Sequence, residues 1–180
     1  MLGPVIRYLG LLPILFNIFV TRAGAAEFLD GSTHQFHLDP EDATTVKVFI
    51  HLSDVDPDCG PFHALPADLS ARTLEATGYG RGRLADEAVA AVVGPGAAVP
   101  SLGPAGFATW CDTTRCLHFG GRPRAGGKPP RDMLLLHYLS PTSNWYPLPG
   151  EAAEPPNRMS RLQPKAGDDA WNAFIGAQLL

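Results

Sequence analysis

Residues 36–62 read FHLDPEDATTVKVFIHLSDVDPDCGPF, and this stretch joins a candidate pair of metal ligands to a strand signal. His37 and Asp39 are two residues apart, so in an extended chain their side chains point to the same side. An imidazole and a carboxylate supply two of the three donors of a 2-His-1-carboxylate metal site. A second histidine is needed, because two such residues on a surface strand commonly have no function.

The residues after this pair predict a buried strand and then a turn. Residues 45–52 (TVKVFIHL) are rich in β-branched and aromatic side chains, and Gly60-Pro61 marks a turn. Alternation along the strand puts the more polar side chains on one face, which therefore suits a pocket. This set is Thr45, Lys47, Phe49 and His51.

The second histidine lies far along the chain, in residues 107–119 (FATWCDTTRCLHF). Only a fold that brings distant strands together could unite His118 with Asp39. Asp112 would share the face of His118 if the strand runs without a bulge, and it could then orient a ligand, or it could cap a turn. The glycine- and proline-rich residues 94–106 predict a loop before this strand.

Four segments, HLDPED, VKVFIHLSDVD, CGPF and DTTRCLHFGGRP, together resemble the phytanoyl-CoA dioxygenase-like branch of the Fe(II)/2-oxoglutarate oxygenases. The last segment is the most specific match, to D-T-x-R-x-x-H-x-G-x-R-P. The resemblance covers about residues 5–147. It implies a mainly β fold, a double-stranded β-helix (a cupin-like jelly roll) with a few flanking helices. It also implies that Fe(II) is bound and that the three catalytic ligands are His37, Asp39 and His118.

The resemblance places an arginine for the cosubstrate 2-oxoglutarate at about Arg131, which opens the strand signal DMLLLHYL. A guanidinium fork can bind a carboxylate through two parallel hydrogen bonds. Arg122 and Arg124 are rival candidates, but they fall in a predicted loop. We expect Phe49 to pack near the cosubstrate and Lys47 to meet an anionic group, although a solvated Lys47 fits the pattern equally well.

The implied activity is hydroxylation of an unidentified small organic substrate by molecular oxygen, with release of succinate and CO2. The turn L-P-A-D at residues 65–68 departs from the V-P-G-S-H turn of the family. One alternative is therefore a catalytically degenerate barrel that binds a metal or small molecule. Retention of all four chemical residues argues against it. The other alternative is a secreted protein without enzymatic activity.

Length and composition fit one globular domain over residues 1–180, with a core of about 27–147 and a proline-rich extension over 148–180 that ends in a predicted short helix. The net charge of -4 gives no basic field, so nucleic acid is not an expected partner. Three cysteines without C-x-x-C spacing indicate free thiols in a reducing compartment. The substrate and the oligomeric state are not predicted.

The apolar residues 8–20 (YLGLLPILFNIFV) allow two interpretations. Followed by small residues, they imitate a secretory signal, but Pro13 and Asn17 interrupt them and they are too short for a comfortable membrane span. We expect a buried element of the domain and a cytoplasmic location, with secretion as the alternative. The family carries a longer segment before H-x-D, so a truncated N-terminus is expected.

Two further histidines and one helix complete the predictions. His34, three residues before the first ligand, is expected at the surface, and His63 is expected to be a packed or exposed side chain without a metal role. Residues 84–93 (LADEAVAAVV) hold the only clear helical pattern after the N-terminus, with acidic residues suited to a first turn.

Overall fold

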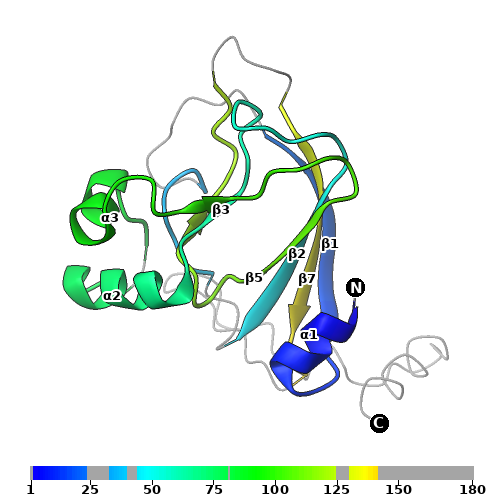
Figure 1. Cartoon of the computed structure of the whole chain (residues 1–180). Coiled ribbons are helices and arrows are strands. Elements are labelled where there is room, and N and C mark those ends of the chain that lie inside the picture. Colours follow the sequence, from blue (N-terminus) through cyan, green and yellow to red (C-terminus); the bar gives the residue numbers. More distant parts are fainter. Residues whose placement is uncertain (1, 24–32, 40–43, 81, 125–129, 142–180) are drawn as a thin grey trace, which may run out of the picture.

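The structure is a computed structural model that describes residues 2–23, 33–39, 44–80, 82–124 and 130–141, and its fold is mainly β (Figure 1). The predicted C-terminal helix lies outside the described residues. In chain order the elements are α1 (Leu2–Leu9), β1 (Ile14–Arg22), β2 (Thr45–His51), β3 (His63–Ala64), α2 (Ala67–Thr77), α3 (Asp86–Val93), β4 (Val99–Pro100), β5 (Ala108–Asp112), β6 (His118–Phe119) and β7 (Asp132–Leu139).

The strands form two antiparallel sheets that pack against each other. The larger sheet has the order β1-β7-β2-β5 and the smaller one the order β4-β3-β6. One buried cluster contains Phe49 of β2 and Leu135 of β7 together with Phe62, which leads into β3, and Ala64 of β3 packs against it. Two packed sheets agree with the predicted β-rich class, while the complete double-stranded β-helix stays a prediction.

The helices cover the outer sides of these sheets. Val5 of α1 packs on Val46 and Val48 of β2, so the apolar face of β2 points away from the smaller sheet. The other face of β2 is left to line the space between the sheets, as the alternation in the sequence predicts. On the other side of the molecule, α2 and α3 lie beside the smaller sheet (Figure 1). Leu69 and Leu74 of α2 and Val89 of α3 join a hydrophobic cluster there.

The N-terminal apolar residues are part of the domain, but they are not a buried element as predicted. They divide into α1 and β1, and β1 is an edge strand that pairs only with β7 among the described strands. Ile18 and Val20 of β1 are largely exposed. No helix in the described ranges is both long and apolar enough to cross a membrane.

Two other predictions are corrected. The helix expected at residues 84–93 is present as α3, but α2 was missed, because its fully buried positions hold the polar residues Ser70 and Thr73. Ser70 can be buried because its hydroxyl donates to the carbonyl of Leu65 and accepts the N–H of Leu117. The strand expected over residues 107–119 is broken between β5 and β6 by a turn.

Candidate metal centre

Backbone hydrogen bonds bring the three predicted ligands together from distant parts of the chain. His37 and His118 lie opposite each other in an antiparallel bridge, in which each N–H donates to the other's carbonyl at 3.0 Å. The N–H of Asp39 donates to the carbonyl of Thr113 at 2.9 Å. Because β6 also pairs with β3, the bridge at His37 extends the smaller sheet by one short segment.

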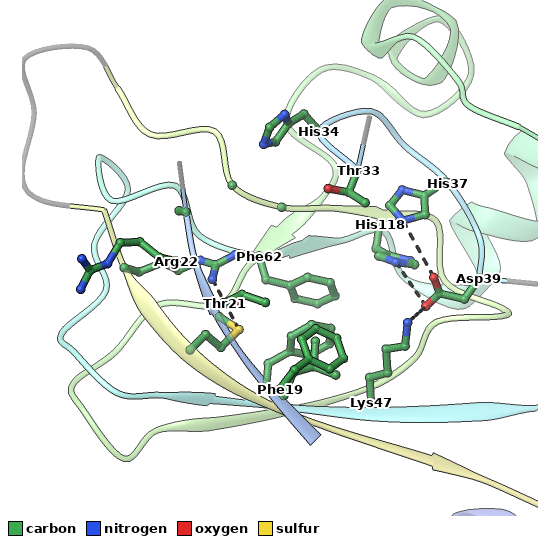
Figure 2. A pocket seen from close by; sticks show the side chains of 17 residues that line it. Phe19, Thr21, Arg22, Thr33, His34, His37, Asp39, Lys47, Phe62 and His118 are labelled. Carbon is green, nitrogen blue, oxygen red and sulfur yellow. Dashed lines mark hydrogen bonds and ion pairs between the residues drawn. The ribbon is translucent and has the colours of Figure 1, made fainter. Parts of the chain in front are cut away.

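The side chains of these residues converge on one point (Figure 2). One donor atom from each of His37, Asp39 and His118 can be chosen so that all three lie within 4.8 Å of one another. Nε2 of His118 is 3.6 Å from Oδ2 of Asp39, and Nε2 of His37 is 4.0 Å from Oδ1. The two imidazoles therefore face the two carboxylate oxygens.

Both imidazoles are held in the tautomer that a metal requires. Nδ1 of His37 lies 2.9 Å from the carbonyl of Gln35, and Nδ1 of His118 lies 3.0 Å from the carbonyl of Cys116. A carbonyl only accepts, so each Nδ1 carries the proton and each Nε2 keeps a lone pair for the centre. Burial lowers the pKa of His118, and burial together with the neighbouring His118 lowers the pKa of His37 to about 4. Both rings are thus neutral near pH 7, the form that binds metal.

Asp39 supplies the negative charge of the cluster. Burial by itself would raise its pKa, but Coulombic attraction by the protonated form of His118 and by the ammonium of Lys47 outweighs burial and holds the pKa below its ordinary value. Oδ2 lies 2.6 Å from Nζ of Lys47, which is its charged partner among the described residues. A largely buried carboxylate that faces two neutral imidazoles fits a divalent cation held by two nitrogens and one oxygen.

The three candidate ligands open into a cavity of about 320 Å³ between the sheets. This volume lies within the range of small-molecule sites. Phe49 and Phe62 form one wall, with their rings stacked at a centroid distance of 3.9 Å. His34, which is partly exposed, also lines the cavity.

Arg131 is buried in the wall of the same cavity. Its Nε donates to the carbonyl of Gly60 at 2.7 Å, which ties it to the predicted turn. A Cβ added to Gly120 would lie 3.3 Å from Nη2 of Arg131. The guanidinium therefore lies beside the backbone two residues after His118. Among the described residues no carboxylate forms an ion pair with Arg131, and desolvation lowers its pKa to about 10. A buried cation without an anion favours binding of an anionic ligand.

The two rival arginines form ion pairs outside the cavity. Arg122 pairs with Asp86 at 2.6 Å and stacks on the ring of Phe119, while the exposed Arg124 pairs with Asp58 at 2.9 Å. Neither lines the cavity that holds the three ligands.

The remaining candidates have structural roles. Asp112 accepts hydrogen bonds from Tyr8 and from Thr114, so it caps the turn after β5 rather than orienting a ligand. His51 is a buried core residue that contacts the hydroxyl of Ser101, and His63 stacks on Phe119. Lys47 is not a solvated side chain, because only 12% of it is exposed.

No protein-family profile matches the sequence, and no curated protein matches it significantly. Solved structures do share its fold. Apo HygX from Streptomyces hygroscopicus has a TM-score of 0.54 and 14% identity, over 85% of this chain and 68% of HygX. SnoK, a non-heme alpha ketoglutarate dependent carbocyclase from nogalamycin biosynthesis, has a TM-score of 0.50 and 18% identity, over 90% of this chain and 61% of SnoK. This chain therefore spans only part of the length of these neighbours.

Proposed function

We propose that this chain is an Fe(II)- and 2-oxoglutarate-dependent oxygenase that acts on a small organic substrate. The observation that carries the proposal is the pairing of two features in one cavity: a converging His-Asp-His cluster and a buried arginine without an anionic partner among the described residues. The fold is shared with SnoK, which is described as alpha ketoglutarate dependent, and this supports the same pair of cofactors.

In this proposal His37, Asp39 and His118 hold iron through their Nε2 atoms and one carboxylate oxygen. Three protein donors leave positions open for a chelating cosubstrate and for oxygen. The fixed Nδ1 contacts of the two histidines orient the rings toward the centre and keep them neutral. Asp39 stays ionised in the metal-free protein and so is ready to bind.

Arg131 binds the distal carboxylate of 2-oxoglutarate, and the keto acid end reaches the metal. Nε of Arg131 donates to the carbonyl of Gly60, and Nη1 donates to the sulfur of Met133 at 3.6 Å, which leaves the other N–H groups of the guanidinium for a carboxylate. Phe49 forms the apolar wall against which the carbon chain of the cosubstrate packs. Lys47 lies at the metal end of the cavity and adds a second positive charge there.

When bound, iron supplies the oxygen chemistry that converts 2-oxoglutarate to succinate and CO2 and oxidises a C–H bond of the substrate. The protein residues orient the two small molecules and exclude water. We propose hydroxylation as the outcome. SnoK is described as a carbocyclase, so the same cofactors support other outcomes in this fold, and the placement of the substrate decides between them.

The test is an anaerobic titration of the metal-free protein with Fe(II) and 2-oxoglutarate, observing the visible charge-transfer band of their chelate. We expect a band for the unaltered protein and for His63→Ala, whose histidine lies outside the cluster, and no band for His118→Ala. Succinate release in the presence of oxygen then measures turnover. A folded protein without the band would refute the proposal, and a band without succinate would favour the alternative of a non-catalytic binding module.

A further inference from the structure

Lys47 is the second buried cation of the cavity, and it contacts a metal ligand. Its Nζ lies 2.6 Å from Oδ2 of Asp39, and the two side chains are 12% and 10% exposed. Lys47 belongs to β2, which lies between β5 and β7 and pairs with both, so its backbone is fixed. Figure 2 shows its side chain extending from β2 to the carboxylate.

This contact serves as a counter-ion in the metal-free protein. A buried carboxylate requires a partner, because an uncompensated buried charge is strongly unfavourable. Lys47 supplies the positive charge that a divalent cation supplies after binding. The cation and the ammonium then lie close together at the same carboxylate and repel each other, since both are positive in a poorly solvated site.

Once a cation neutralises Asp39, the charge of Lys47 is no longer needed there. The side chain of Lys47 lines the same cavity as Arg131. An anionic ligand that binds both Arg131 and the metal must occupy this cavity. A carboxylate of the anionic ligand then replaces Asp39 as the ion-pair partner of Lys47. The two binding events are therefore linked through one side chain, and linkage between two ligands is reciprocal.

We propose that Lys47 is a positioning residue that exchanges counter-ions: it pairs with Asp39 in the metal-free protein and with a carboxylate of the keto acid after the divalent cation binds. This inference rests on the proposed function. It predicts opposite effects of removing the ammonium: the metal binds more tightly, because repulsion is lost, and the keto acid binds more weakly, because attraction is lost. A purely structural lysine would weaken both.

The experiment is isothermal titration calorimetry with Co(II), followed by 2-oxoglutarate on the Co(II)-loaded protein. For Lys47→Met we expect Co(II) affinity to rise and 2-oxoglutarate affinity to fall, each by about 5- to 150-fold, the usual range of coupling between two binding events. Arg22→Met is the matched control, because it removes a positive charge at the cavity that is already paired with Asp132. Neither affinity should change in that variant.

Lys47→Gln is the second variant, in case Lys47→Met does not fold; it keeps a polar group and removes the charge, so the same two opposite shifts are expected. Two affinities that fall together, or two that stay unchanged, would overturn the counter-ion exchange while leaving the proposed function intact. Failure of the unaltered protein to bind Co(II), or binding that persists in His118→Ala, would instead remove the proposed function and this inference with it.

Discussion

Replacing Arg131 with methionine should make the metal-free protein more stable while weakening cosubstrate binding. The fall in its pKa from 12.5 to about 10 corresponds to about 3 kcal/mol of unfavourable free energy for the buried charged side chain. Methionine removes this term and keeps an apolar side chain of similar length. Against it stands the lost hydrogen bond to Gly60, whose carbonyl would be left unpaired at a cost of about 1–3 kcal/mol. We therefore expect the free energy of unfolding to rise by about 0–2 kcal/mol.

The effect on the cosubstrate has the opposite sign. Hydrogen bonds to a charged group contribute about 1.5–3 kcal/mol, which corresponds to a loss of about 10- to 150-fold in the affinity for 2-oxoglutarate. Arg131 would thus lower the stability of the protein and raise its affinity for 2-oxoglutarate, as expected for a buried charge that binds an anionic ligand.

Urea unfolding of the metal-free protein measures the first effect, and calorimetric titration of the Co(II)-loaded protein with 2-oxoglutarate measures the second. Arg124→Met is the control, because the exposed pair with Asp58 should change stability by no more than about 0.5 kcal/mol and leave binding unaltered. A variant that loses more than about 2 kcal/mol of stability and binds 2-oxoglutarate normally would show that Arg131 is a structural residue.

Three further predictions concern the surroundings of the site. The pKa of His37 is about 4 in the folded metal-free protein against 6.5 ordinarily, so the unfolded chain binds more protons between these values. The free energy of unfolding should then fall by about 3 kcal/mol as the pH drops from 6.5 to 4. In urea unfolding of His37→Gln, the decrease that is due to protonation of His37 should be absent. Leu117→Ala, at a fully buried position, should lower the free energy of unfolding by about 2–5 kcal/mol in the same assay. A smaller loss would mean that neighbouring side chains move to fill the space left by the leucine. Gly60→Ala should cost at least about 1 kcal/mol and weaken 2-oxoglutarate binding, because Gly60 has a φ of 72° and an added Cβ would lie 2.7 Å from the nitrogen of Pro123. Unchanged stability would contradict the strain argued for this turn.

The cluster of candidate metal ligands could be predicted because its signals are local and chemical. H-x-D spacing places two donors on one side of any extended chain, and the segment around His118 carries a specific motif. The strand at β2 could be predicted because both of its faces are partly buried, which enriches it in β-branched and aromatic residues. The role of Arg131 was a prediction from resemblance, and its burial without a carboxylate partner among the described residues supports it.

What could not be predicted depends on contacts between distant residues. The helix α2 buries Ser70, whose hydroxyl is satisfied by Leu65 and Leu117, and the sequence contains no local sign of those partners. The break between β5 and β6 depends on Asp112, which accepts hydrogen bonds from the turn after it and from Tyr8 of α1. A short polar side chain that caps a turn is compatible with a continuing strand until its partners are known.

Main-chain hydrogen bonds bring the residues of the candidate site together, so substituting one of the candidate ligands leaves these bonds in place. The bridge between His37 and His118 and the bond from Asp39 to Thr113 use main-chain atoms, which remain when a side chain is replaced. His118→Ala therefore removes a candidate metal donor but keeps the hydrogen bonds that hold β6 beside His37. A loss of metal binding in such a variant reports on the imidazole itself.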